Sequence, residues 1–569
     1  MLKLDRVIFF IERRYKWSVI VVSAFIIYLA ISLVYFAPSS ITQLSHSIFN
    51  NGGDPQQFIW YYNWWPYALT HNLNPFISKY AWFPNGYNLS WSTSIPSLAL
   101  IMAPITLLGG AILSFNLVAI LSPVLAALSA FLLIYYLTKK YIASLLGGYI
   151  YGFSSYELGQ LFGHPGLYAT FIIPLLILLF ILAFRQRIKP LTYVILSAFL
   201  LAFELGISLE IFATFILFSV IAILVIYLSV KEYKQRLLAC AKYAMYALGG
   251  VLVIASPFLY YLAVGYRNVP KVIHPISAFS TNAANLLIPT QATLIGGHSL
   301  AFLSDRFTAN IAENGAYLGL PILIALGFIF IKYWRNKNIR ALSFILIIIG
   351  IASLGPKLHL ISQTGTIVPL PWVIFTKLPL IRSAQPDRLS LYFFLIAGVI
   401  LAMWLSMKAG SKKQMYIKYA VVALGAISLI PATSLYIWSQ PVVPKVFQPD
   451  NVVEYIPKNS NILILPFNKL GSGIFYQYAS GMEFTQTGGY VGFIPKDFAN
   501  NRTIKALMSG TLPPDFAELF KHFCITNQAS KIVYSIQQTS PQLVAIISSY
   551  RWPEKKVGSN VVVNVDFTK

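Results

Sequence analysis

One acidic residue stands at the start of a predicted helix inside a long, nearly uncharged segment. Asp54 follows Gly52 and Gly53 and precedes Pro55, a pattern that predicts a helix with Asp54 as the N-cap and Pro55 at the first helical position. A carboxylate within hydrogen-bond reach of an acceptor hydroxyl can act as a general base. Asp54 is therefore a candidate base, although a capping role alone also explains the residue.

The segment around this acid is rich in aromatic residues. Residues 49–91 hold 14 aromatic side chains, five of them Trp, and only two charged residues. Trp60, Trp64 and Tyr67 follow one another at helical spacing, which predicts a helix that presents aromatic faces to the lipid interface. Pro66 is expected to end or kink this helix.

Other ionisable residues lie in or beside apolar stretches, where a charge is costly and commonly functional. Glu157 and His164 flank one short connection, Glu210 lies where two apolar stretches meet, and Glu313 directly precedes another. All four are candidates to line a cavity. Glu210 is also a candidate second catalytic carboxylate, or a ligand of a divalent cation such as Mg²⁺ or Mn²⁺. A proline follows His164, so a simple helix start is the alternative for that residue.

Three basic residues are candidates for binding a lipid phosphate. Arg382 and Arg388 precede an apolar stretch, and Lys357 lies earlier in the same proline-rich segment. A guanidinium bonds two phosphate oxygens at once, which suits recognition of a phosphate group. The alternative is that Arg388 pairs with a nearby acid, Asp387 or Glu313, or extends to the interface.

The composition is that of a polytopic α-helical membrane protein. Of the 569 residues, 57% are hydrophobic and only 11% are charged, too few to cover a water-soluble globule of this size. A bilayer core needs about 20 apolar residues per helix. Eleven predicted spans lie near residues 17–37, 112–137, 141–158, 166–184, 191–209, 211–229, 240–264, 315–333, 341–356, 389–407 and 417–438. Segments 96–110 and 355–388 are interrupted by prolines and are expected to be re-entrant or interfacial.

The basic residues predict the orientation of these spans. The chain has 42 Lys and Arg against 18 Asp and Glu, a net charge of +24. With a cytoplasmic N-terminus, 22 of the basic residues before residue 440 lie in cytoplasmic segments and eight lie on the opposite side. The excess charge therefore records membrane orientation rather than nucleic-acid binding, and eleven crossings put the C-terminus outside.

Two domains are predicted. Residues 1–439 form a membrane domain with a long first outer loop at 38–95, and residues 440–569 form an extracytoplasmic α/β domain. Within the second domain, strands are predicted at 461–466, 531–536 and 560–566, and helices at 514–523 and 541–550. It contains no metal-ligand cluster, P-loop or GxSxG motif.

The organisation of the whole chain resembles the GT-C superfamily of integral membrane glycosyltransferases. That resemblance implies a polyprenyl-phosphate sugar donor and a catalytic acid in the first outer loop, a position that Asp54 matches. Pro55 stands where protein mannosyltransferases carry a second acid, and the WWDYG motif of oligosaccharyltransferases is absent despite Trp64 and Trp65. Both departures argue against protein mannosylation and en bloc glycan transfer.

The resemblance and the residues together predict a glycosyltransferase of the cell membrane and cell envelope. It would transfer a hexosyl or pentosyl group from a lipid-linked donor to an extracytoplasmic glycan, lipid or protein, inverting the anomeric centre with Asp54 as base. No cofactor is certain, and a divalent cation is a candidate. The alternatives are a transporter or lipid flippase, and a non-catalytic scaffold for glycan assembly.

Overall fold

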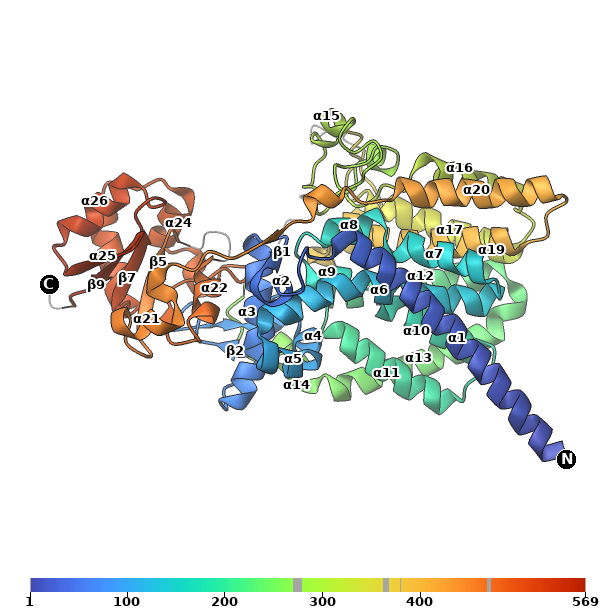
Figure 1. Ribbon diagram of the computed structural model, residues 1–569, viewed down its shortest axis with the longest axis horizontal. Helices are drawn as coiled ribbons and strands as arrows, with labels where there is room; N and C mark the ends of the chain where they lie inside the picture. Colours follow the sequence, from blue (N-terminus) through green and yellow to red (C-terminus); the bar gives the residue numbers. More distant parts are fainter. Residues whose placement is uncertain (1, 270–278, 362–367, 379, 468–471, 568–569) are drawn as a thin grey trace. The chain divides into compact units, whose positions relative to one another are not determined.

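A computed structural model describes residues 2–269, 279–361, 368–378, 380–467 and 472–567, with side chains from residue 16 onward (Figure 1). The chain divides into two compact units, which are treated separately below. The helical unit comprises Met1–Ser39, Leu117–Ile254 and His274–Ile437. The mixed unit comprises Ser40–Asn116, Ala255–Ile273 and Trp438–Lys569.

Long apolar helices dominate the helical unit. Its longer helices are α1 (Leu2–Phe36), α6 (Ala111–Thr138), α7 (Tyr141–Gly152), α10 (Ile172–Phe184), α11 (Pro190–Leu205), α12 (Leu209–Ser229), α13 (Lys234–Ile254), α16 (Leu320–Lys332), α17 (Lys337–Ser353), α19 (Ser390–Ser406) and α20 (Lys412–Ser428). The first six residues of α6 belong to the mixed unit. Among the described residues, six helical segments are long and apolar enough to cross a bilayer. The protein is therefore a multi-pass membrane protein.

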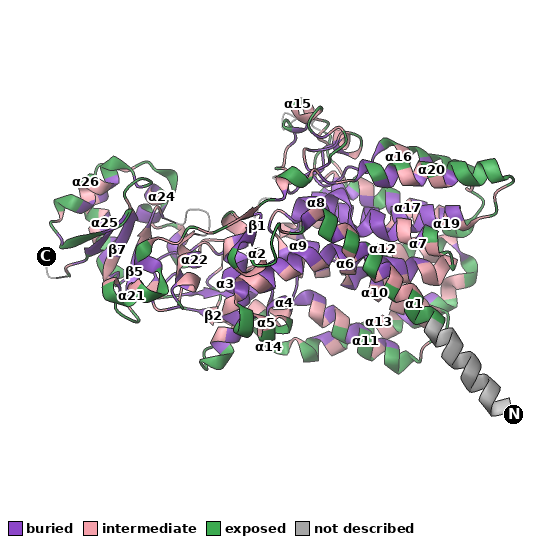
Figure 2. Ribbon diagram, in the orientation of Figure 1, coloured by how far each residue is buried: buried purple, intermediate pink, exposed green. Residues whose placement is uncertain are grey.

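Helix α19 is largely buried within this unit: 83% of the most apolar stretch of Pro386–Ser406 is buried, against 17% for α12. Figure 2 shows the ribbon coloured by the burial of each residue. A close backbone approach explains why α7 packs tightly against α19: a Cβ added at Gly398 would lie 2.7 Å from the carbonyl oxygen of Gly147. Glycine on both helices thus permits the contact. The low burial of α12 is what a lipid-facing helix requires.

Helices occupy each of the eleven predicted spans, although the number of crossings remains a prediction. Three spans are broken. Span 141–158 consists of α7 and the short α8 (Ser155–Gln160), span 166–184 of the short α9 (Pro165–Tyr168) and α10, and span 240–264 of α13 and α14 (Ser256–Ala263). Segment 96–110 forms two short helices, α4 (Pro96–Ile101) and α5 (Ala103–Gly109). Segment 355–388 lies partly outside the described residues.

The mixed unit contains a five-stranded sheet of order β6-β5-β7-β9-β8. Its strands are β5 (Asn461–Leu465), β6 (Thr485–Gln486), β7 (Lys531–Ser535), β8 (Glu554–Val557) and β9 (Asn560–Asn564). Strand β5 runs parallel to β6 and β7, whereas β9 pairs antiparallel with β7 and β8. The core that packs on the sheet includes Phe447, Val452, Ile462, Phe484 and Val533.

Helices around the sheet are α21 (Pro449–Tyr455), α22 (Ser472–Ala479), α23 (Lys496–Ala499), α24 (Arg502–Ser509), α25 (Phe516–Thr526) and α26 (Pro541–Ser549). The three strands and two helices predicted from the tail lie within two or three residues of β5, β7, β9, α25 and α26. From the first loop, the same unit takes α2 (Gln43–His46), α3 (Gly53–Thr70) and the hairpin of β2 (Ile77–Ser78) with β3 (Tyr87–Asn88), and from segment 96–110 it takes α4 and α5.

Candidate active site

The chain that leads into α3 is fixed by one buried asparagine. The Asn116 amide donates to the carbonyls of Leu44 (2.8 Å) and Ser47 (2.7 Å), and its oxygen accepts from the Phe49 N–H (3.1 Å). Strand β1 (Ile48–Phe49) also pairs with β4 (Trp438–Ser439), which joins the first loop to the C-terminal part of the unit. The start of α3 therefore has a defined position within the mixed unit.

Helix α3 begins earlier than the sequence predicts. Gly52 is the N-cap and makes no side-chain cap hydrogen bond, and Asp54 lies in the first turn, so the prediction that Asp54 is the N-cap is wrong. Pro66 does not end the helix, which continues to Thr70. Asp54 still lies in the first turn, at the positive end of the helix dipole.

The aromatic residues of α3 form a core, so the prediction that they face the lipid interface is wrong. Trp60, Trp64 and Trp65 are each no more than 2% exposed. The rings of Trp60 and Trp64 stack with centroids 5.1 Å apart, and the Trp60 indole donates to the Gln477 side chain at 2.9 Å. Helix α22, from the C-terminal part of the chain, packs against α3 and helps to bury these rings. The sequence of the first loop alone does not reveal this packing. These rings therefore make a rigid support for the start of the helix.

A tyrosine from the C-terminal part of the chain reaches the candidate base. The Tyr490 hydroxyl donates a hydrogen bond to Oδ1 of Asp54 at 2.9 Å. The two residues are 436 positions apart, and both side chains are half-buried. Burial, together with the nearby Asp54 carboxylate, raises the pKa of Tyr490 well above its ordinary value. The hydroxyl therefore stays protonated at neutral pH and acts as a donor.

The backbone just before Tyr490 is tied to the first loop. The Trp82 N–H donates to the Gly488 carbonyl (2.7 Å), and the Phe83 N–H donates to the Gln486 carbonyl (3.1 Å). Gly489 has a φ of +126°, and a Cβ added there would lie 2.9 Å from Cβ of Ala81. Only glycine fits this position without strain. The contacts hold Tyr490 in place beside Asp54.

A second tyrosine lines the same region. Tyr61 is fully buried, accepts a hydrogen bond from the Gln57 amide at 2.8 Å, and contacts the Val491 carbonyl at 3.4 Å. Burial raises the pKa of Tyr61 to about 12. The surroundings of Asp54 thus combine a carboxylate with neutral hydroxyl and amide groups.

A separate ionic cluster lies in the helical unit. The Arg388 guanidinium forms ion pairs with Glu210 and Glu313, and its Nε donates to Glu313 Oε2 at 3.0 Å. Glu210 also accepts from the Gln385 N–H at 2.7 Å. The structure therefore brings Glu210, Glu313 and Arg388 together, and it contains the pairing with Glu313 that stood as the alternative to phosphate binding.

Hydrogen bonds extend this cluster to α8 and His164. The Gln160 amide donates to Glu313 at 3.0 Å, and its oxygen lies 2.8 Å from Nδ1 of His164. Glu313 is only 4% exposed. Burial raises the pKa of Glu313, but the two contacts from Arg388 outweigh burial and hold this pKa below its ordinary value. Glu313 is therefore charged in the folded protein.

Two further buried carboxylates differ in their partners. Glu157 is fully buried, and one of its carboxylate oxygens accepts a hydrogen bond from the Thr170 hydroxyl, while the other has no partner among the described residues. Asp387 is 2% exposed, and neither of its carboxylate oxygens has a hydrogen-bond partner among the described residues. Arg388 thus pairs with Glu313 rather than with Asp387, the other acid that the sequence offered. Tyr490 is the residue beside Asp54 that the sequence pattern does not indicate, because it lies in no recognisable motif.

The two remaining basic candidates are unpaired. Arg382 lies in the short 3-10 helix η4 (Ile381–Ser383) and is half-buried, while Lys357 is exposed. Neither side chain has a hydrogen bond or ion pair with any described residue. Among the described residues, no carboxylate neutralises their charges, unlike that of Arg388.

No three His, Cys, Asp or Glu side chains within the described ranges are grouped as a metal site. In the helical unit, Arg388 already occupies oxygens of both Glu210 and Glu313. A divalent cation at these two carboxylates would have to displace the guanidinium. The donor set of this cluster therefore fits an arginine rather than a metal ion.

Comparisons with solved structures identify the fold. Arabinofuranosyltransferase AftD from Mycobacteria is 13% identical, with a TM-score of 0.59 over 97% of this chain and 40% of that one. The oligosaccharyltransferase of Archaeoglobus fulgidus in its apo form is 12% identical, with a TM-score of 0.50 over 93% of this chain and 71% of that one. The same enzyme in complex with Zn and sulfate gives 13% identity and a TM-score of 0.51 over 92% and 69%. These neighbours confirm the resemblance to the GT-C fold.

Sequence comparisons add the family. No curated protein sequence matches the chain. One family model matches residues 24–430, which is most of the chain. The protein belongs to this family, described as a domain of unknown function (DUF6311).

Proposed function

We propose that this protein is a membrane glycosyltransferase that transfers a sugar from a polyprenyl-phosphate donor to an extracytoplasmic acceptor. One observation carries the proposal: a half-buried carboxylate, Asp54, at the start of a helix in the first loop, oriented by the hydroxyl of Tyr490. The GT-C fold supports the same class of reaction. The acceptor is a hydroxyl of a glycan, lipid or protein.

In the proposed reaction, Asp54 accepts the proton of the acceptor hydroxyl while that oxygen attacks the anomeric carbon of the donor. The bond between this carbon and the phosphate oxygen breaks, and its electron pair leaves with the polyprenyl phosphate. Attack from the face opposite the phosphate inverts the anomeric configuration. Tyr490 acts as a positioning residue, because its hydrogen bond restricts the rotation of the Asp54 carboxylate.

The departing phosphate requires positive charge. Arg382 and Lys357 suit this role because no described carboxylate neutralises them, and Arg388 is the third candidate, although two carboxylates already engage it. We propose that Glu210 acts through Arg388 by holding its guanidinium. Replacing Arg382 with Gln is expected to raise the KM for the donor more than it lowers kcat, whereas Arg306→Gln, at an exposed arginine of the same unit, is expected to leave both unchanged.

The proposal extends to a divalent cation, Mg²⁺ or Mn²⁺, with Asp54 as an oxygen ligand. The complex of the Archaeoglobus fulgidus enzyme with Zn supports testing for such an ion. Activity is expected to fall on treatment with EDTA and to return on addition of Mg²⁺ or Mn²⁺. Unchanged transfer after chelation would remove the cation from the proposal and leave the base in place.

The decisive experiment replaces Asp54 with Asn and measures transfer from a radiolabelled polyprenyl-phosphate sugar by the full-length protein in proteoliposomes. Loss of a general base is expected to lower kcat by about 100- to 10,000-fold. Asp497→Asn is the matched control, since Asp497 is an exposed carboxylate of the same unit that accepts only one amide hydrogen bond, from Asn85.

Full activity of Asp54→Asn would contradict the assignment of the base. No transfer by the wild-type protein with any labelled polyprenyl-phosphate sugar would contradict the enzyme class. Movement of labelled lipid across the bilayer without transfer would instead identify a flippase. If the protein neither transfers the sugar nor moves the lipid, the scaffold is the function that remains.

A further inference from the structure

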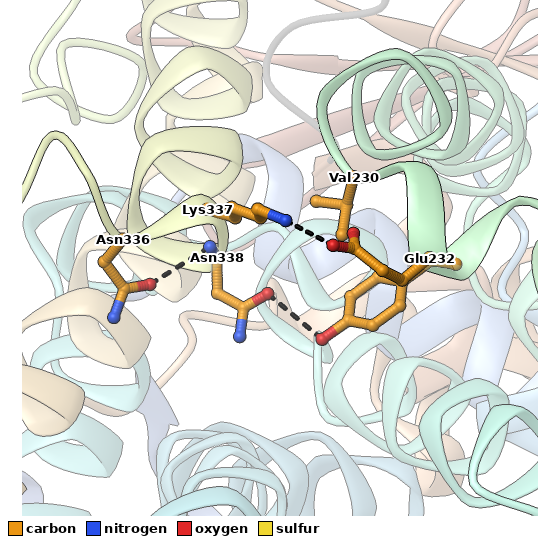
Figure 3. Close-up of a pocket in the computed structure, with 6 residues that line it drawn as sticks. Val230, Glu232, Asn336, Lys337 and Asn338 are labelled. Atoms are coloured by element: carbon orange, nitrogen blue, oxygen red, sulfur yellow. Dashed lines mark hydrogen bonds and ion pairs between the residues drawn. The ribbon is translucent and has the colours of Figure 1, made fainter.

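Two connections of the helical unit, far apart in sequence, meet at one pocket. The first is the 3-10 helix η2 (Lys231–Tyr233) between α12 and α13, and the second joins α16 to α17. Lys337 forms an ion pair with Glu232, and the Tyr233 hydroxyl donates to Asn338 Oδ1 at 3.3 Å. Figure 3 shows the Lys337 ammonium directed at Glu232 across the pocket. These contacts fix the two connections against each other.

The pocket between them has a volume of about 430 Å³ and a polar lining. Its walls are formed by Val230, Glu232, Tyr233, Asn336, Lys337 and Asn338. The Lys337 ammonium, which also pairs with Glu232, and the side-chain amides of Asn336 and Asn338 provide several hydrogen-bond donors in this small space, while the Tyr233 hydroxyl already donates to Asn338. Donors gathered in this way suit an anion with several acceptor oxygens.

Positive charge is concentrated around this pocket, in a set of residues that we call the basic turn pair. Its members are Lys231, Lys234, Arg236, Lys332, Arg335, Lys337 and Arg340. Glu232 is the one acid in these two connections. Among the described side chains of the basic turn pair, only Lys337 forms an ion pair, and its partner is Glu232. The first turns of α13 and α17 contain no acidic residue, although acids are favoured at the start of a helix. The basic turn pair therefore carries a large uncompensated charge.

Apolar side chains that face outward adjoin this charge. Leu228, Leu238 and Ile331 are 69%, 59% and 77% exposed and lie at the ends of apolar helices beside the basic residues. Trp334 is 42% exposed, and the Arg340 guanidinium lies 5.8 Å from the centre of its ring. Exposed tryptophan and basic residues at the end of a span are typical of the headgroup level of a bilayer.

We propose that the pocket and the basic turn pair bind the phosphate headgroup of an anionic bilayer lipid, with its acyl chains along the exposed apolar side chains. This site is independent of the proposed transfer reaction. The basic residues also fit the predicted cytoplasmic orientation, but orientation requires only their charge and does not account for a preformed polar pocket. The proposal therefore makes a claim about the geometry of the pocket that charge alone does not make.

The test uses the full-length protein in neutral detergent with dioleoylphosphatidylglycerol, and counts bound lipid by native mass spectrometry. Arg335→Gln/Lys337→Gln is expected to weaken binding roughly tenfold, because each basic residue near an anionic lipid contributes measurably. Lys412→Gln/Lys413→Gln is the matched control, since these exposed lysines open α20, another 17-residue helix with a side-chain N-cap. It removes the same charge and is expected to change binding less than twofold.

A second variant separates pocket shape from charge and from loss of the Glu232 ion pair. Asn338→Leu keeps every charge, replaces an amide of the lining with an apolar group and removes the acceptor of the Tyr233 hydroxyl, so it is expected to weaken binding of the lipid about fivefold. Equal losses in the two double variants, or unchanged binding by Asn338→Leu, would overturn the site. Equal binding of dioleoylphosphatidylcholine, or full competition by sn-glycerol 3-phosphate, would overturn the anionic lipid as its ligand.

Discussion

Arg388 is expected to be the residue on which the stability of its ionic cluster depends most. Its guanidinium contacts Glu313 through two nitrogens and Glu210 through a third, and the side chains of Arg388, Glu210 and Glu313 are 16%, 20% and 3% exposed. Replacing Arg388 with Gln leaves two carboxylates in a site that water reaches poorly. Removal of one partner from a buried ion pair costs about 3–5 kcal/mol.

The carboxylate variants are expected to cost less, in a defined order. Glu313→Gln exchanges two charge-assisted hydrogen bonds for one neutral acceptor, which costs about 1.5–3 kcal/mol. It still leaves Arg388 paired with Glu210. Glu210→Gln replaces one such bond on the more exposed carboxylate and is expected to cost about 1 kcal/mol. The predicted order of destabilisation is therefore Arg388→Gln, then Glu313→Gln, then Glu210→Gln.

The assay is the unfolding midpoint of each variant at pH 7 in one detergent, with the double variant Arg388→Gln/Glu313→Gln included. Removing both members of a pair is expected to cost less than the sum of the two single changes by about 2 kcal/mol. Glu454→Gln, which breaks an exposed pair with Lys555, is the control and is expected to produce no measurable change. An additive double variant, or an Arg388→Gln protein as stable as the control, would refute the reasoning.

The same cluster predicts a pH dependence. The folded protein holds the pKa of Glu313 below the value that it has in the unfolded chain. The contribution of Glu313 to stability is therefore complete above the unfolded pKa of about 4.3 and is lost as pH falls through the lowered folded value. The difference in midpoint between wild type and Glu313→Gln is expected to shrink between pH 5 and pH 3. A difference that stays constant over this range would contradict the assignment.

Three further changes test the surroundings of Asp54. Tyr490→Phe is expected to cost about 1–2 kcal/mol of unfolding free energy in wild type and little in an Asp54→Asn background, and equal losses in both would show that the hydroxyl does not act through Asp54. Gly489→Ala is expected to lower the thermal midpoint more than Gly481→Ala, because both glycines have positive φ but a Cβ is blocked only at Gly489; equal shifts would contradict the close approach to Ala81. Asn116→Ala removes three hydrogen bonds from the segment before α3 and is expected to cost about 3 kcal/mol by the same measurement, whereas a shift as small as that of a surface substitution would contradict its role.

The sequence by itself determined the apolar helices, most strands of the C-terminal sheet and the presence of an acid at the start of α3. Each of these follows from a local cause, such as a run of apolar residues, alternation along a strand, or a Gly-Gly-Asp-Pro turn. Predictions from local pattern were wrong where a side chain's partner lies far away in the sequence. The aromatic rings of α3 were predicted at the lipid interface, yet α22, with its Gln477 side chain, helps to bury them.

Only the tertiary structure decided which side chains meet. Tyr490 reaches Asp54 across 436 positions, and Arg388 reaches Glu210 and Glu313 across 178 and 75. A hydrogen bond or ion pair between such distant residues depends on how the helices and the sheet pack, and single-sequence periodicity contains no record of that packing. The physical reason is that the burial of apolar surface selects the fold, and the fold then sets the partners of each polar group.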